Sequence, residues 1–213
     1  MHEGGKQLAE HYYTARPTSE HAPGQVRYAM PDGTVMVFAT DAGVFSKERI
    51  DRGTREMLKA VVPKPGDRVL DLGCGYGPIG IVLAALEPRA FVTMVDINER
   101  ACELARRNLA TNSISNAEVL CGDAFEVVGD RRFNMVVTNP PIRAGRRVLE
   151  AMVQGAHDRL ADGGQLFLVI RTSQGAASMK AYMEGVFGNA DEPEKGGGYR
   201  VIRSVRISAH DKA

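Results

Sequence analysis

The feature that most restricts the fold of this chain is a short apolar strand followed at once by a glycine-rich loop, VLDLGCGYGPIG at residues 69–80. Glycines stand at positions 73, 75, 77 and 80. Glycine allows sharp turns and lets a ligand approach the backbone closely. Pro78 predicts the first turn of a helix, whose unpaired N–H groups attract electron-rich ligand atoms. The segment therefore predicts a strand–turn–helix unit that holds a nucleotide-like ligand.

The same loop also matches the dinucleotide fingerprint, since residues 75–80 read G-x-G-x-x-G and Asp96 follows about 20 residues later. Taken alone, this match is weak evidence. Two features favour a different ligand: Asp71 lies inside the strand, and residues 139–141 read Asn-Pro-Pro, which hydride transfer does not need. An NAD-dependent oxidoreductase and a generic doubly wound domain with a tight turn stay open as alternatives.

Together, the glycine loop, Asp71 and the Asn-Pro-Pro tripeptide resemble the class I S-adenosylmethionine-dependent methyltransferases. In that family the strand acid and the glycine loop hold the methionine part of the cofactor. An acid after the second strand, here Asp96, holds the ribose hydroxyls, and an acid after the third, here Asp123, meets the adenine. Helix capping is the alternative role for Asp123. The resemblance implies these cofactor contacts: Asp71, Gly73, Cys74, Gly75, Asp96, Ile97, Asp123, Ala124 and Asn139.

Length and composition are those of an ordinary globular protein: 213 residues, 44% of them apolar and 25% charged, are enough for a full core. Three widely spaced cysteines predict reduced thiols rather than a disulfide framework or a zinc site. Five histidines without metal-ligand spacing give no reason to expect a metal. No apolar run is long enough to span a bilayer, and the first residues lack the order of a signal peptide, so we expect a cytoplasmic protein without a membrane partner.

From residue 68 onward, strand and helix patterns alternate along the chain. Continuous apolar runs predict strands at residues 68–72, 91–96, 118–120, 133–138 and 165–170. Apolar residues at helical spacing predict helices at residues 79–86, 99–111, 146–160 and 176–186. Residues 199–207 alternate polar and apolar, which predicts a half-solvated antiparallel strand. The predicted fold is α/β, a doubly wound Rossmann-like sheet with a C-terminal antiparallel hairpin, with ligands at the carboxyl ends of the strands.

Residues 1–67 are expected to form a small N-terminal appendage that packs on a catalytic domain at residues 68–213. Strand patterns at 26–30 and 34–40 flank a Pro-Asp-Gly turn and predict a hairpin, and a helix is predicted at 52–61. A unit this small does not bury a stable core alone, so we expect it to cover part of the larger domain.

The chain also resembles, more specifically, the small-methyltransferase-domain family that includes the RsmC-type guanine-N2 methyltransferases of ribosomal RNA. The residues that carry this resemblance are GVFSKERIDRGT at 43–54, HYYTARPTS near the start and NPPIRAG at 139–145. The resemblance implies an exocyclic amine as acceptor, and guanine N2 of small-subunit (16S) ribosomal RNA is the expected target. Ile142 stands where many Asn-Pro-Pro enzymes have an aromatic residue, so Phe45, Tyr12 or Tyr13 would have to stack on the base.

The Asn-Pro-Pro tripeptide suits this chemistry because a guanine amine is a poor nucleophile whose lone pair is delocalised into the ring. A site that accepts hydrogen bonds from both N–H groups directs the lone pair towards the methyl group. The Asn139 side-chain oxygen and the Pro140 carbonyl can accept these bonds, and the prolines restrict the loop without adding donors. No general base with a tuned pKa is required. The expected catalytic residues are Asn139, Pro140, Pro141 and Ile142.

The net charge is only +1, so any attraction to ribosomal RNA must come from local patches. Arg143 and Arg146 directly follow the tripeptide and, with Phe45, are the expected substrate-binding residues. A solvated helix face is the alternative for most other arginines. Two further functions stay open: N-methylation of a protein glutamine, which Asn-Pro-Pro also suits, and a non-catalytic RNA-binding or assembly protein that retains the fold.

Overall fold

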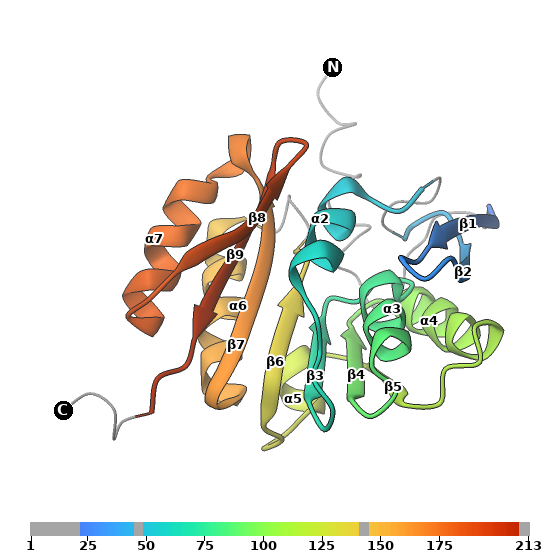
Figure 1. The fold of residues 1–213 in the computed structure, drawn as a ribbon, viewed down its shortest axis with the longest axis horizontal. Coiled ribbons are helices and arrows are strands. Elements are labelled where there is room, and N and C mark those ends of the chain that lie inside the picture. The colour runs from blue at the N-terminus through green and yellow to red at the C-terminus, as the bar shows by residue number, and fades with distance from the viewer. Residues whose placement is uncertain (1–21, 45–48, 141–144, 209–213) are drawn as a thin grey trace.

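The computed structural model describes residues 22–44, 49–140 and 145–208 of the chain. A seven-stranded sheet with the order β5-β4-β3-β6-β7-β9-β8 runs through the molecule (Figure 1). In that order its strands are Ala117–Cys121, Phe91–Asp96, Arg68–Leu72, Phe133–Thr138, Leu160–Arg171, Tyr199–Val205 and Asp191–Gly196. Neighbours from β5 to β7 are parallel, whereas β9 and β8 pair antiparallel at the end of the sheet. The predicted doubly wound α/β fold with a C-terminal hairpin is confirmed.

Helices cover both faces of this sheet and bury a separate apolar cluster on each (Figure 1). On one face lie α2 (Arg52–Ala60), α3 (Pro78–Leu86) and α4 (Glu99–Thr111). The other face packs against α5 (Ala124–Val127), α6 (Arg146–Arg159) and α7 (Ala176–Phe187). Because both faces are covered, the parallel strands carry apolar residues at almost every position, as their sequence indicated.

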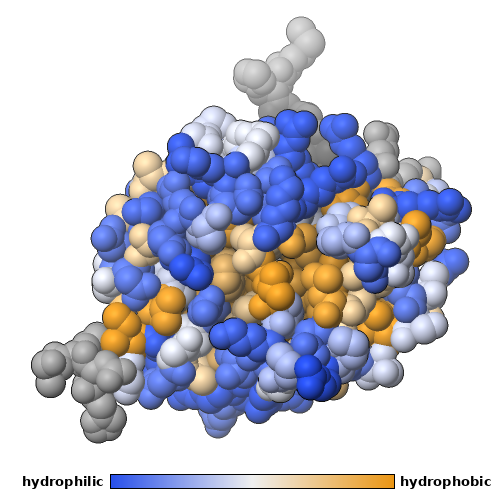
Figure 2. All heavy atoms as spheres, viewed as in Figure 1, coloured by the Kyte–Doolittle hydropathy of each residue, from blue (hydrophilic) through white to orange (hydrophobic). Residues whose placement is uncertain are grey.

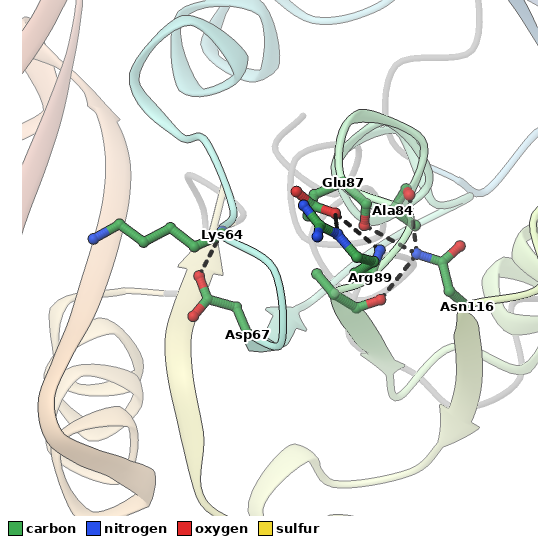
Figure 3. A network of polar contacts seen from close by, with 7 residues as sticks. Lys64, Asp67, Ala84, Glu87, Arg89 and Asn116 are labelled. Atoms are coloured by element: carbon green, nitrogen blue, oxygen red, sulfur yellow. Dashed lines mark hydrogen bonds and ion pairs between the residues drawn. The ribbon is translucent and has the colours of Figure 1, made fainter.

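Polar side chains fix the turns at the amino ends of the parallel strands (Figure 3). The Asn116 amide donates to the carbonyls of Ala84, Glu87 and Ala90 at 3.0–3.3 Å. Ala84 lies in the last turn of α3 and Glu87 is the C-cap, where helix carbonyls have no intrahelical partner. Asp67 accepts from the Lys64 N–H at 2.8 Å and closes the turn before β3. These turns lie at the opposite ends of the strands from the glycine loop.

A two-stranded antiparallel hairpin, β1 (Gly24–Ala29) and β2 (Val35–Thr40), lies beside α4 (Figure 1). The edge of β2 that is not paired with β1 bonds to the side chains of Asn108 in α4 and of Asn112, the C-cap of α4. Asn108 exchanges hydrogen bonds of 2.7 and 3.0 Å with the Ala39 backbone, and Asn112 exchanges bonds of 2.9 and 2.8 Å with Val37. Asn108 is fully buried and also donates to the Tyr76 carbonyl at 2.9 Å.

The described part of residues 1–67 therefore packs on the larger part of the chain at two places. The hairpin β1–β2 contacts α4, and α2 contacts β7, β8 and β9. These contacts are of the kind expected for an appendage that covers the catalytic domain. The division at residue 67 stays a prediction.

Two elements near the C-terminus differ from their sequence-based prediction. β7 begins at Leu160 rather than at residue 165, because Gly163 and Gly164 pair with Arg206 through two backbone hydrogen bonds of 2.8 Å. Residues 191–196 form the edge strand β8, although DEPEKG has neither alternation nor β-branched residues. Hydrogen bonding to β9 makes this segment a strand although its residues have low strand propensity. The proline in β8 is tolerated because β8 is an edge strand.

Hydrophobic side chains gather in the middle of the face seen in Figure 2, over the region of β6, β3 and α3, with hydrophilic residues around them. Val62, which follows α2, is the most exposed large apolar residue at 70%. Within the described ranges, no helix is long and apolar enough to cross a membrane.

Candidate active site

A cavity of about 570 Å³ opens where β3, β4, β5 and β6 end. Each of these four strands contributes residues at or just after its carboxyl end: the glycine loop after β3, Asp96 at the end of β4, Asp123 after β5 and Asn139 after β6. Asp51 and Thr54 at the start of α2 and four residues of α6 also line the wall. The volume is in the range of cofactor sites, roughly 300–1,000 Å³. The two sequence motifs, far apart in the chain, thus meet in one cavity.

The glycine loop presents bare backbone to this cavity. Gly73 and Gly75 have φ angles of 74° and 58°, in the left-handed region that favours glycine. Both line the cavity, and a Cβ added at either would meet no protein atom within 4 Å. A ligand can therefore lie directly against the peptide groups of the loop. Cys74 also lines the cavity, and burial raises the pKa of its thiol well above the ordinary value.

Asp71 lies behind the glycine loop rather than in the cavity wall. Its side chain is buried, and its Oδ2 accepts a hydrogen bond from the Gly80 N–H at 2.8 Å. Its Oδ1 has no partner among the described residues. Burial raises the pKa of this carboxyl to about 7. Asp71 thus fixes the start of α3, and its predicted contact with the cofactor stays a prediction.

The raised pKa of Asp71 predicts a pH-dependent stability. The unfolded chain releases this proton near the ordinary pKa of 3.8, whereas the folded chain keeps it to about 7. Between these values the folded state binds more protons, so the free energy of unfolding falls by up to about 1.4 kcal/mol per pH unit and levels off above. Asp71→Asn keeps the acceptor for Gly80 and should remove this part of the slope. Denaturant titrations of both proteins from pH 4 to 8 test it; parallel curves would contradict it.

Asp96 connects the end of β4 to the glycine loop. Its Oδ2 accepts from the Gly75 N–H at 2.8 Å, and its Oδ1 accepts from the Asn98 N–H at 2.9 Å. Burial raises the pKa of this carboxyl above its ordinary value. The next residue, Ile97, lines the cavity and is 41% exposed. This pair combines a carboxylate with an apolar surface, as a ribose and an adjoining base require.

Asp123 lines the cavity from the end of β5 and also caps α5. Its side chain accepts from the Phe125 N–H at 3.3 Å, so the capping alternative is confirmed, while the adenine contact stays a prediction. Ala124 is the first residue of α5. The Phe125 ring lines the cavity and packs so closely on α6 that a Cβ added at Gly155 would collide with it.

Asn139 projects into the cavity from the end of β6 and is held by α2. Its Nδ2 donates to Asp51 Oδ2 and to Thr54 Oγ1, both at 3.1 Å. Pro140 is buried. Asp51 and Thr54 were not predicted as site residues, although both belong to the D-x-G-T phrase that carried the family resemblance. An aspartate directly before a predicted helix start was the available signal.

Of the predicted substrate-binding residues, only Arg146 is among the described residues. Arg146 is exposed at the start of α6 and forms an ion pair of 2.6 Å with Glu150. Its neighbour Arg147, which was not among the predicted substrate-binding residues, lines the cavity together with Val148, Ala151 and Met152 of α6. The other predicted residues, Phe45, Pro141, Ile142 and Arg143, lie outside the described residues. In the described parts of the chain, no group of three or more His, Cys, Asp or Glu side chains is placed to hold a metal ion.

The seven-stranded sheet, its antiparallel end and a ligand cavity beside the glycine loop define a class I methyltransferase fold. The chain belongs to the methyltransferase small domain family, whose model matches residues 35–203.

Three comparisons illustrate this membership. The uncharacterized protein YbxB of Bacillus subtilis is 36% identical over 94% of this chain and all of its own length. The ribosomal RNA large subunit methyltransferase G of Streptomyces avermitilis is 32% identical over 86% of this chain and 50% of its own. The 16S rRNA N2 methyltransferase RsmC of T. thermophilus, solved with AdoMet and guanosine, matches with a TM-score of 0.77 and 28% identity over 89% of this chain and 52% of its own. The chain spans about half the length of these two enzymes.

Proposed function

We propose that this protein transfers a methyl group from S-adenosylmethionine to the exocyclic N2 amine of guanine in small-subunit ribosomal RNA. The methyltransferase small domain family supports the reaction class, and the RsmC relative with AdoMet and guanosine supports the cofactor and the base. The observation that carries the proposal is the position of Asn139, an oriented amide at the rim of a cofactor-sized cavity.

The cavity fits the cofactor in shape and charge. Bound S-adenosylmethionine supplies an electrophilic methyl group on a positively charged sulfur. Gly73 and Gly75 would lie against its methionine part, because their backbone is open to the cavity. The carboxylates of Asp96 and Asp123 would accept from the ribose hydroxyls and the adenine amine, and their negative charge suits a cationic ligand. Phe125 adds an apolar surface for the adenine ring.

Asn139 and Pro140 would hold the acceptor amine. Both hydrogens of the Asn139 amide are used by Asp51 and Thr54, so its Oδ1 is the atom left to accept from a substrate N–H. The Pro140 carbonyl is the second candidate acceptor. Two acceptors fix the plane of the amine and direct its lone pair out of the conjugated ring. Preorganised acceptors of this kind supply catalysis through orientation, and no proton has to be removed before transfer.

Transfer of a labelled methyl group tests the proposal. Small subunits, large subunits, naked ribosomal RNA and a release-factor-like protein are each incubated with the enzyme and tritiated S-adenosylmethionine, with ribosomes from a strain that lacks the gene. We expect label in small-subunit RNA, recovered as N2-methylguanosine after nucleoside mapping. Label in large-subunit RNA would contradict the subunit, label on glutamine would favour the protein methyltransferase, and cofactor binding with no transfer would favour a non-catalytic protein.

The position of Arg147 predicts a salt-dependent contribution to RNA binding. An arginine on a phosphate releases a counterion, so its loss lowers the salt slope of the binding constant by about 0.9. Arg147→Ala should therefore raise the KM for RNA and flatten its salt dependence, with kcat nearly unchanged. Arg146→Ala should act in the same direction. Arg89→Ala removes an exposed arginine from the turn before β4, at the amino ends of the strands, and is the control. A loss of kcat with no change in KM or salt slope would contradict the assignment.

A further inference from the structure

We propose that Asp51 is the positioning residue that orients Asn139 as a hydrogen-bond acceptor for the substrate amine, an inference that rests on the proposed function. An asparagine side chain exposes an acceptor on one side and a donor on the other, and a half-turn of its amide exchanges them. Only one of these two orientations presents an oxygen to an N–H group of the substrate. The orientation of Asn139 therefore decides whether the site can hold an amine at all.

Asp51 selects this orientation because an ionised carboxylate only accepts hydrogen bonds. With Nδ2 at 3.1 Å from Asp51 Oδ2, the Asn139 amide makes a charge-assisted hydrogen bond. After a half-turn, Asn139 Oδ1 would lie against that carboxylate oxygen, and two acceptors would repel each other. Thr54 cannot make the same selection, because a hydroxyl both donates and accepts. Its Oγ1, also 3.1 Å from Nδ2, engages the second amide hydrogen.

Contacts from α2 and β9 hold Asp51 in place, and a residue of β7 holds the partner on β9. As the N-cap of α2, its Oδ2 accepts from the Gly53 N–H at 2.8 Å. Its Oδ1 lies 3.4 Å from the hydroxyl of Tyr199, which is buried on β9. That hydroxyl in turn accepts from Arg171 Nε at 2.8 Å, at the end of β7. The carboxylate is thus fixed by the rigid sheet as well as by the helix, which is what a positioning group requires.

The charge of Asp51 has a second effect on the same hydrogen bond. A carboxylate beside the amide NH₂ polarises the amide, so that Asn139 Oδ1 becomes a stronger acceptor. The substrate nitrogen also gains positive charge as its lone pair forms the new bond, and a nearby negative charge stabilises that change. A neutral residue at position 51 would lose both effects even if it kept the hydrogen bond.

Asp51→Asn tests the inference with little change in shape. Asparagine is as good an N-cap as aspartate, so α2 should stay folded. We expect kcat to fall by about tenfold to thirtyfold, with the KM for RNA and the affinity for S-adenosylmethionine within about twofold of wild type. In an Asn139→Ala background the same substitution should change kcat by less than about twofold, because the group that it acts through is gone. Asp67→Asn, in the exposed turn at the amino end of β3, is the matched control (Figure 3).

The side-chain amide of Asn139 gives a readout that does not depend on activity. In protein labelled with ¹⁵N-asparagine, the signal that is absent from Asn139→Ala should show downfield protons that exchange slowly with water. Asp51→Asn should move it towards the free amide position. Unchanged kcat in Asp51→Asn, an equal loss in the Asn139→Ala background, or an unmoved amide signal would each overturn the inference. A wild-type protein that methylates no guanine would instead overturn the proposed function, and the amide signal would still decide the contact.

Discussion

Asn139→Ala should lower turnover about a hundredfold to a thousandfold while S-adenosylmethionine still binds nearly as tightly as to wild type. The side chain of Asn139 is held by Asp51 and Thr54 and leaves one oxygen for the substrate amine. Alanine removes that acceptor without touching the glycine loop or Asp96. The loss should therefore appear in the transfer step, measured as single-turnover methylation of ribosomal RNA, and not in the calorimetric affinity for the cofactor.

Asn134→Ala is the matched control for this experiment. Asn134 lies on the same strand, β6, but near its amino end, where its side chain accepts from the Arg68 N–H at 2.9 Å. It should keep normal turnover. Near-normal turnover in Asn139→Ala would show that other groups hold the substrate amine. A loss of cofactor affinity as large as the loss of turnover would show that Asn139 acts on the cofactor and not on the amine.

Asp96→Ala should weaken the binding of S-adenosylmethionine by about tenfold to 150-fold, which corresponds to roughly 1.5–3 kcal/mol for hydrogen bonds to a charged group. The carboxylate lines the cavity and at the same time accepts from Gly75 N and Asn98 N. Its removal takes away an acceptor for the ribose and leaves two backbone N–H groups without their partner. Both effects act on cofactor binding, so the change belongs in the dissociation constant.

Calorimetry of folded protein measures this constant, with circular dichroism to show that the variant keeps its secondary structure. Asp67→Ala removes a carboxylate that also accepts from a backbone N–H, but in the turn before β3. That variant should bind the cofactor as wild type does. Unchanged affinity in Asp96→Ala would refute the assignment of Asp96 to the cofactor.

The parallel core of this fold was predictable because burial on both faces forces a continuous apolar run on each strand. β3, β4 and β6 have the predicted bounds, and α4 begins and ends where its pattern does. β8 was not predictable, since the segment DEPEKG becomes a strand only through pairing with β9. The residues of a segment alone do not predict a pairing with a distant strand.

The site was predictable where a residue lies at or just after the carboxyl end of a strand, as Asp96, Asp123 and Asn139 do. The contact between Asp51 and Asn139 was not, because it joins residues 88 positions apart and depends on how α2 packs on the sheet. For Asp71 the sequence identifies the residue but does not decide between two structural roles. An acid in a strand before a glycine loop gives the same sequence pattern whether or not it also accepts a hydrogen bond from the start of the next helix, as Asp71 does from the Gly80 N–H.

The two asparagines Asn108 and Asn112, in α4 and at its C-cap, have a consequence for how the molecule opens. Each side chain offers one carbonyl and one amide, the same groups as a peptide bond, so Asn108 and Asn112 act as a short substitute strand along β2. Over these residues the edge has no free groups to recruit another chain. Asn108 also donates to the Tyr76 carbonyl in the glycine loop, so one side chain of α4 holds both the hairpin and the loop. We therefore expect a local opening that displaces α4 at Asn108 to release the hairpin and the glycine loop together.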